Sequence, residues 1–325
     1  VGVTNPLPIV DIAGVGLNAT DTVIRLPHFP AFGSKVEFRV AEVLLGGQVA
    51  SALVACKRWG LTARYAGKIG DDSYGKLHQD EMARLGIEAH WAVAPNCPSQ
   101  SSFILVDGQT GERTVLWKRD PRLELLPSDL RKEWVTRARL LHVDGHDCKA
   151  AATAALWARE AGIPVTADLD NLYPGVEALL ENVDFAITSR DFPGRLTGEE
   201  DLFLSLPRLA SRFGCRVFGA TLGEDGVLAW DGAAFHYSPA FAIQPVDTTG
   251  AGDMFHAAFA YGLLRDMNLP ERLEFSCAAA GLSCTGVGAR GGIASLAEIE
   301  TLIREGVRRP AAFSEERLSA GGNAP

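Results

Sequence analysis

Apolar runs that resemble β-strands alternate with helical patterns along most of this chain. The strand-like runs lie at 8–13, 140–143, 163–167, 185–188 and 217–221. Helical periodicity occurs at about residues 47–60, 73–86, 148–162, 200–214, 250–266, 270–285 and 296–306. This order predicts an α/β fold with a mainly parallel sheet and helices on both faces. With 325 residues and 47% hydrophobic content, the chain can bury a large core.

Two stretches break this alternation. Residues 22–45 contain two prolines and then an apolar alternation at Val36, Phe38 and Val40, and residues 101–118 read as a β-hairpin. Together they predict a small antiparallel sheet outside the main sheet. Such a sheet beside a ligand cleft would act as a lid.

The domain organisation follows from these patterns. We expect one domain at 1–312, with the lid segments at about 22–45 and 101–118 inserted in it. Residues 313–325 have no core-forming pattern, and we expect them to be a mobile tail.

Charge and composition exclude several function classes. The net charge is −9, the isoelectric point is about 5.3 and basic residues form only short pieces, so a nucleic-acid partner is not expected. No apolar run approaches the roughly 18 residues that span a bilayer, and the first residues do not resemble a signal peptide. The six cysteines form no C-x-x-C pair, which favours reduced thiols. We expect a cytoplasmic protein without a membrane partner.

The turn at 250–253 carries the clearest chemistry. Gly250, Ala251 and Gly252 lead into an apolar helix, and the first N–H groups of a helix together with its dipole attract phosphate. Asp253 lies in the same turn, where a carboxylate would repel phosphate but could take a proton from an attacking hydroxyl. The combination predicts phosphoryl transfer.

Segment 247–255, Asp-Thr-Thr-Gly-Ala-Gly-Asp-Met-Phe, resembles the D-T-x-G-A-G-D signature of the ribokinase-like (PfkB) carbohydrate kinases. A second signature of that family, a Gly-Gly pair opening a helix and a later Gly-Asp-Asp turn, is similar to 46–52 and 67–75. The resemblance covers about residues 8–306. It implies a three-layer α/β/α sandwich with a β-sheet lid, ATP and Mg²⁺ as cofactors, and a sugar as the acceptor.

The resemblance also implies roles for individual residues. Asp253 would be the base, and the N–H groups of Gly250, Ala251 and Gly252 would form the anion hole. The substrate-binding residues would be Asp21, Gly46, Gly47, Ser51 and Asp144. The nucleotide-binding residues would be Ser189, Thr221, Gly223, Gly226 and Cys277. Asp247 and Thr249, with the loop at 286–295, resemble the monovalent-cation site of some members, where K⁺ would bind.

Two departures from the family pattern bear on substrate and metal. Ser51 stands where the family often has Asn in the sugar pocket, and its hydroxyl has a shorter reach. The N-x-x-E motif that helps to organise magnesium should fall near 188–192, but Ser189 and Phe192 occupy its key positions. The sugar, the hydroxyl that is phosphorylated and the handling of magnesium therefore stay open.

Several alternatives compete with a sugar kinase. A nucleoside kinase of the same fold would share the signature, and a catalytically inactive sugar-binding protein would fit the missing motif. Residues 14–19 match the G-x-G-x-x-A fingerprint of dinucleotide-binding enzymes, but the β-branched residues and prolines that follow favour extended chain. A metal cluster at 142–148 is disfavoured because strand alternation separates its ligands. The apolar lid segments would permit a homodimer.

Overall fold

A computed structural model describes residues 7–320, and in this part of the chain the main sheet has nine strands in the order β13-β12-β11-β10-β9-β8-β1-β4-β5. The strands are β1 (Val10–Val15), β4 (Ala63–Gly70), β5 (Glu88–Ala94), β8 (Ala138–Asp144), β9 (Val165–Leu169), β10 (Phe185–Ser189), β11 (Val217–Thr221), β12 (Val227–Trp230) and β13 (Phe235–Ser238). Strands β5 to β11 of this order pair in parallel, while β12 and β13 are added antiparallel at one edge. The mainly parallel sheet is thereby confirmed.

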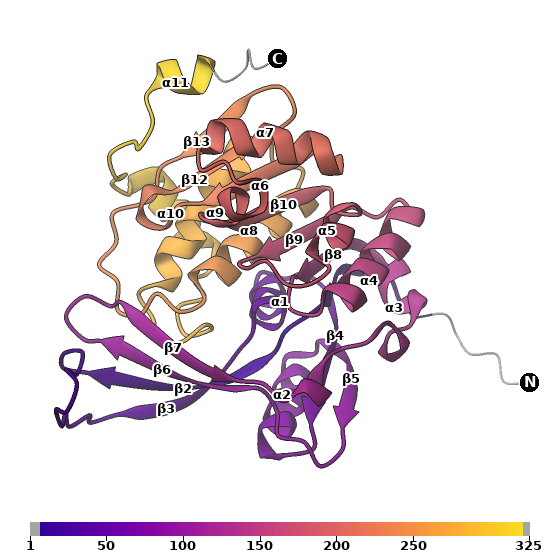
Figure 1. Ribbon diagram of the computed structural model, residues 1–325, viewed down its shortest axis with the longest axis vertical. Coiled ribbons are helices and arrows are strands. Elements are labelled where there is room, and N and C mark those ends of the chain that lie inside the picture. The colour runs from indigo at the N-terminus through magenta and orange to yellow at the C-terminus, as the bar shows by residue number, and fades with distance from the viewer. Residues whose placement is uncertain (1–6, 321–325) are drawn as a thin grey trace, which may run out of the picture.

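Helices cover both faces of this sheet, as the alternation predicts (Figure 1). One face packs against α3 (Lys132–Thr136), α4 (Cys148–Glu160), α5 (Val176–Leu180), α6 (Phe192–Thr197) and α7 (Leu202–Phe213). The other packs against α1 (Gln48–Arg58), α2 (Ser73–Leu85), α8 (Ala251–Leu264), α9 (Leu269–Ser283) and α10 (Leu296–Glu305). Each helix predicted from periodicity is present. The three-layer fold is confirmed, and its core lies in two apolar layers, one on each side of the sheet.

The lid is a four-stranded sheet that extends from the body at the lower left of Figure 1. Its strands are β2 (Ala19–Leu26), β3 (Ala41–Gly46), β6 (Ser101–Asp107) and β7 (Arg113–Lys118), in the order β3-β2-β6-β7. The predicted hairpin is β6–β7. The central pair β2–β6 is parallel, so the sheet is mixed and not purely antiparallel.

One part of the lid prediction is wrong. Val36, Phe38 and Val40 do not form a strand, because they lie in the connection between β2 and β3. The pairing of these two strands ends at Ile24 with Ala41, so residues 36–40 have no strand beside them to complete their hydrogen bonds.

The end of the chain returns to the body. Phe313 stacks edge-on against Phe203 and Tyr237, with ring centroids 5.1 and 5.2 Å apart, and α11 (Glu315–Ala320) follows. Arg317 in this helix pairs with Asp201 at 2.9 Å. Residues 1–6 of the predicted domain and 321–325 of the predicted tail lie outside the described residues.

The topology places a crevice at one edge of the main sheet. The seven parallel strands of the main sheet, β11, β10, β9, β8, β1, β4 and β5, point the same way, so their carboxyl ends meet at a single edge. Strand β1 lies between β8 and β4, and the chain order reverses beside it, which is where open α/β sheets bind ligands. In residues 7–320, the helices are all too short or too polar to cross a bilayer.

Candidate active site

A cavity of about 410 Å³ lies between the carboxyl edge of the main sheet and the inner face of the lid. Four structural groups contribute side chains to its wall: the lid, the strand ends, the start of α1 and the start of α8. The wall includes Asp21, Ser102, Arg113, His146, Asp168, Asp170, Ser189, Thr221, Gly47, Thr249, Gly250, Gly252, Asp253 and His256. The structure therefore brings the predicted base together with predicted sugar-binding and nucleotide-binding positions.

Asp253 lies in the first turn of α8, on the side that faces the cavity. Burial raises the pKa of Asp253 well above its ordinary value, and the charges of Asp168 and Asp21 raise it further. Arg113 and the Ser51 hydroxyl oppose this shift. A carboxylate with a raised pKa holds a proton more strongly, which suits a general base for an alcohol.

The turn before Asp253 has the geometry of an anion site. Gly250 is the N-cap with φ 78°, and a Cβ there would lie 2.5 Å from Cα of Ala289. A Cβ on Gly252 would meet nothing within 4 Å, because this residue faces open space. Within residues 7–320 the N–H groups of Gly250 and Gly252 have no acceptor, whereas that of Ala251 donates to the Thr248 carbonyl at 3.3 Å. The N–H groups of Gly250 and Gly252, two of the three predicted donors, are thus free to bind an anion.

The lid supplies Asp21 from β2. Its carboxylate is buried and accepts a hydrogen bond from the Ser102 hydroxyl of β6 at 2.5 Å. Burial raises the pKa of Asp21, although the hydrogen bond from Ser102 opposes the shift. A Cβ on the neighbouring Gly46 would lie 2.3 Å from Asp21 Oδ2, so this glycine leaves room for the carboxylate.

A side chain at position 47 is excluded for a different reason. Its φ is 97°, and a Cβ would lie 2.4 Å from Cα of Asn18, in the connection between β1 and β2. The residue lines the cavity and forms the N-cap of α1. The glycine pair thus lets the start of this helix approach the strand connection closely.

Ser51 and Asp144 lie behind the cavity wall. Ser51 is fully buried in α1 and accepts a hydrogen bond from Arg290 Nε at 3.2 Å. Asp144 ends β8 and accepts bonds from the N–H groups of Leu17 and His146, at 2.6 and 3.0 Å. Burial raises the pKa of Asp144 to about 7. The structure thus gives Asp144 a supporting position under the Leu17 backbone.

Arg290 ties several of these elements together. It pairs with Glu81 of α2 and donates to the Gly46 carbonyl at 2.9 Å, in addition to Ser51. Burial lowers the pKa of this guanidinium to about 10. Its loop therefore holds α1, α2 and β3 in a fixed relation behind the lid side of the cavity.

The predicted nucleotide residues divide into two groups. Ser189 and Thr221, at the ends of β10 and β11, line the cavity. Gly223 and Gly226 form the turn between β11 and β12, and Cys277 is buried in α9 with its Sγ 3.8 Å from the Ser238 carbonyl. These three lie outside the wall of the cavity.

The predicted cation residues organise a loop contact. Asp247 is fully buried, and its two oxygens accept bonds from the N–H groups of Thr249 and Gly288, each at 2.8 Å. The hydroxyl of Thr249 is buried and has no partner in the described part of the chain. Asp247 thus connects the turn at 250–253 to the 286–295 loop.

Two alternatives from the sequence can be compared with this geometry. The chain after Gly16 enters β2 at Ala19 and not a helix, so a dinucleotide fingerprint lacks its helix N-terminus. In the segment 142–148, His142 points into the core and bonds Thr166, while His146 faces the cavity. Over residues 7–320 no three His, Cys, Asp or Glu side chains come close enough to hold a metal on their own.

Sequence reasoning missed part of the site. Asp168 and His256 form a buried pair, with Oδ1 and Nε2 3.2 Å apart, and Asp170 follows on the same strand connection. Burial would raise the pKa of Asp168, but the charge and hydrogen bond of His256 outweigh it and lower that pKa. Burial and Asp168 raise the pKa of Asp170 to about 6. Two signals were present: both aspartates follow a predicted strand, and His256 is three residues after Asp253 on the same helix face.

Comparison with known proteins places this fold and site in one class. Residues 11–295 match the pfkB family carbohydrate kinase model. The ribokinase of Lactococcus lactis subsp. lactis is 27% identical over 305 residues, 90% of this chain and 97% of the relative. The fructoselysine 6-kinase of Escherichia coli is 28% identical over 242 residues, 72% and 87% of the two chains. The crystal structure of ribokinase from Thermotoga maritima superposes with a TM-score of 0.75 at 26% identity, covering 91% of this chain and all (100%) of the other.

The fold and the matched length therefore define a carbohydrate kinase. The chain belongs to the PfkB family of carbohydrate kinases, and it is a phosphotransferase that acts on an alcohol group. Kinases of this family use ATP with a divalent metal ion.

Proposed function

We propose that the chain transfers the γ-phosphate of ATP to a hydroxyl, a primary one, of a ribose- or ketohexose-like sugar. Asp253 is the base, and the Gly250–Gly252 turn is the anion hole. One observation carries the proposal: the base, two open N–H groups and the buried carboxylate of Asp21 share a single cavity.

The geometry supports an in-line transfer. Asp21 would accept hydrogen bonds from sugar hydroxyls and hold the acceptor on the lid side. The Asp253 carboxylate would take the hydroxyl proton as that oxygen forms its bond to the γ-phosphorus. The bond from the γ-phosphorus to the bridging oxygen breaks and ADP leaves. Meanwhile the N–H groups of Gly250 and Gly252 would stabilise charge on the transferred group.

The cavity also fits a nucleotide-borne Mg²⁺ ion. Asp168 is 5% exposed, and its Oδ2 lies buried without a hydrogen-bond partner in the described residues. Mg²⁺ in kinases commonly uses one or two carboxylates and completes its shell with water and phosphate oxygens. Asp168 and Asp170 would hold the ion, whose charge would help to neutralise the phosphates. These carboxylates would replace the missing N-x-x-E motif, since Phe192 is buried in the core.

We assign the nucleotide to the side of Ser189 and Thr221, where the turn containing Gly223 and Gly226 and the helix containing Cys277 support the wall from behind. A K⁺ ion at Asp247 and the buried Thr249 hydroxyl would stabilise the catalytic turn. Turnover in potassium should then exceed turnover in tetramethylammonium at equal ionic strength. Equal rates in the two salts would contradict the cation site.

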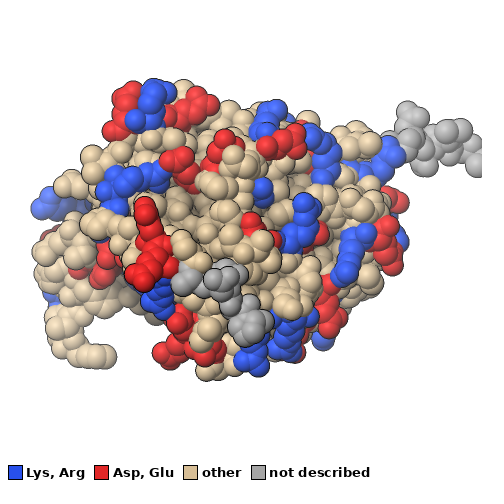
Figure 2. All heavy atoms as spheres, turned by 90° about the horizontal axis from the view of Figure 1, so that it is seen from above, with Lys and Arg blue, Asp and Glu red and all other residues tan. Residues whose placement is uncertain are grey.

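The outer face of the lid supports a homodimer. Val43, Phe103 and Leu116 form one row across β3, β6 and β7, and they are 51, 55 and 56% exposed. Replacing Phe103 with Asp should produce monomers in sedimentation velocity if this face is an interface. Basic and acidic side chains are interspersed over the face shown in Figure 2, which supports small ligands over a nucleic acid.

An ADP-release screen tests the activity and ranks the acceptors. The panel contains ribose, fructose, fructose phosphates, sulfonated and deoxy sugars, and nucleosides. Turnover with a sugar supports the proposal, whereas turnover with nucleosides alone identifies a nucleoside kinase. Sugar binding without any turnover identifies a binding protein.

A variant of the base tests the mechanism. Asp253→Asn should lower kcat on the order of 10²- to 10⁴-fold with little change in sugar binding. Glu298→Gln is the matched control, because Glu298 is an exposed carboxylate in the first turn of α10. Near-normal turnover of Asp253→Asn would show that the assigned base is wrong.

A further inference from the structure

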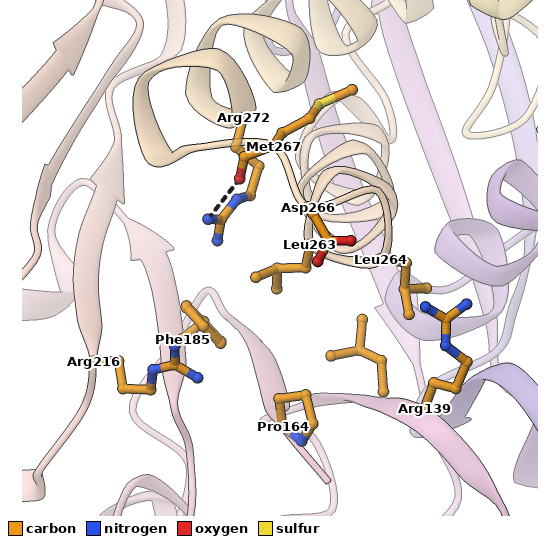
Figure 3. A pocket seen from close by; sticks show the side chains of 10 residues that line it. Arg139, Pro164, Phe185, Arg216, Leu263, Leu264, Asp266, Met267 and Arg272 are labelled. Carbon is orange, nitrogen blue, oxygen red and sulfur yellow. Dashed lines mark hydrogen bonds between the residues drawn. The ribbon is translucent and has the colours of Figure 1, made fainter.

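A second cavity, of about 400 Å³, lies at the opposite edge of the main sheet, where the strands begin (Figure 3). Phe185 starts β10, Arg216 precedes β11, and Leu263 and Leu264 end α8. Helix α8 has 14 residues, so its two ends are about 20 Å apart. The same helix therefore begins at the catalytic turn and ends at this separate cavity.

Arg272 of α9 brings unpaired donors to this cavity. The residue is only 9% exposed, and its Nη2 donates to the Met267 carbonyl at 3.1 Å. Its Nε and Nη1 atoms are buried and have no acceptor within residues 7–320. A buried donor without a partner costs on the order of 1–3 kcal/mol, so an acceptor at this position would be stabilising.

A second guanidinium faces the same space. Arg216 has no carboxylate within ion-pair distance among the described residues, and its Cζ lies 4.9 Å from the centroid of the Phe185 ring. Arg272 Cζ lies 5.6 Å from the centroid of the same ring, and Figure 3 shows the head groups of Arg216 and Arg272 on one side of the cavity, near Phe185. Burial, together with the charge of Arg216, lowers the pKa of Arg272 to about 10. Two like charges thus share a cavity that lacks a counter-ion for both.

The other charged groups of the wall do not cancel this pair. Arg139 is already paired with Asp11 at 2.9 Å. Asp266 contributes one carboxylate, and the carbonyl end of α8 adds a partial negative charge. Two guanidinium groups against one carboxylate leave the cavity with a net positive charge.

We propose that this cavity binds a phosphate group between Arg216 and Arg272, either as inorganic phosphate or as the phosphoryl group of a small phosphomonoester. Guanidinium groups bind phosphate oxygens with paired, directional hydrogen bonds. The volume exceeds that of one phosphate ion, and Pro164, Leu263 and Leu264 offer an apolar wall to the carbon part of an ester. This site goes beyond the kinase activity proposed above and does not depend on it.

Calorimetric titration of the full chain with inorganic phosphate, at fixed ionic strength, tests the proposal. Arg216→Met should raise the Kd for phosphate on the order of 10- to 100-fold, because a hydrogen bond between charged groups is lost. Arg272→Met should do the same. Arg212→Met is the matched control, since Arg212 lies on α7 and pairs with Glu177 outside the cavity. If phosphate bound only at the catalytic turn, none of the three substitutions would change its Kd.

The outcomes are distinct. Binding that is lost in both cavity variants and kept in Arg212→Met supports the site. Should Arg272→Met fail to fold, the exposed Arg216 still provides the decisive variant. Tighter binding of glycerol phosphate than of inorganic phosphate identifies an ester as the ligand, and the reverse identifies the free ion. Absence of binding to the unaltered chain, or equal binding in the Arg216→Met and Arg212→Met variants, overturns the proposal.

Discussion

Replacing Gly252 with Ala should separate stability from catalysis. Gly252 is the second residue of α8, and an added methyl group would contact nothing within 4 Å. Alanine in a helix is favoured over glycine by roughly 0.5–1 kcal/mol. For a chain of this size we expect a rise in Tm of about 1–3 °C. The new methyl group would stand in the space that the transferred phosphoryl group must enter.

The same Gly252→Ala substitution that raises Tm should lower kcat. Loss of one donor from an oxyanion hole costs on the order of 10²–10³ in kcat, and displacement of the phosphoryl group from the Gly252 N–H should approach the lower figure. Thermal unfolding and the ADP-release assay on the same preparation measure both quantities. Unchanged turnover in Gly252→Ala would refute the placement of the phosphoryl group at this turn.

Gly250→Ala is the natural comparison, because the two glycines serve different purposes. Gly250 has φ 78°, a conformation that costs other residues roughly 1–2 kcal/mol. Its Cβ would also lie 2.5 Å from the Ala289 backbone, so the 286–295 loop must move. We expect this variant to lose stability and activity together. A variant as stable as the unaltered chain would contradict the assigned backbone conformation.

Three further predictions follow from the site. Burial raises the pKa of Asp253, and the charges of Asp168 and Asp21 raise it further, so kcat/KM should fall on the acid side well above pH 3.8 as the base becomes protonated. Asp168→Asn removes one of these charges and should move the acid limb to lower pH, whereas a limb that does not move would contradict the coupling. Asp21→Asn should raise the sugar KM by roughly 10- to 100-fold in steady-state kinetics and leave the nucleotide KM unchanged, whereas equal effects on both would place Asp21 elsewhere. Arg290→Met should destabilise the fold by about 3–5 kcal/mol in urea unfolding, and the double variant with Glu81→Met should recover much of this loss; a double variant no more stable than Arg290→Met would argue against the pairing.

Local chemistry made the turn at 250–253 recognisable from the sequence alone as a phosphate-attracting helix start. The glycines, the aspartate and the apolar helix that follows are consecutive, so their relation depends only on backbone geometry and on the first turn of one helix. The alternation of strands and helices was equally local, and it predicted the layered fold. Strands β4 and β5 were missed because glycine and charged residues interrupt their apolar pattern.

Only the tertiary structure decided which distant residues meet. Asp21 reaches Ser102 across 81 positions because β2 and β6 pair in parallel, and this pairing leaves no trace in either strand by itself. Arg216 and Arg272 share a cavity only because the start of α9 and the end of α8 lie beside the starts of β10 and β11 at one edge of the sheet. Periodicity reports which face of an element is buried, but the partner of that face is chosen by the packing of the whole chain. The phosphate-attracting turn was therefore visible in the sequence, whereas the second cavity was not.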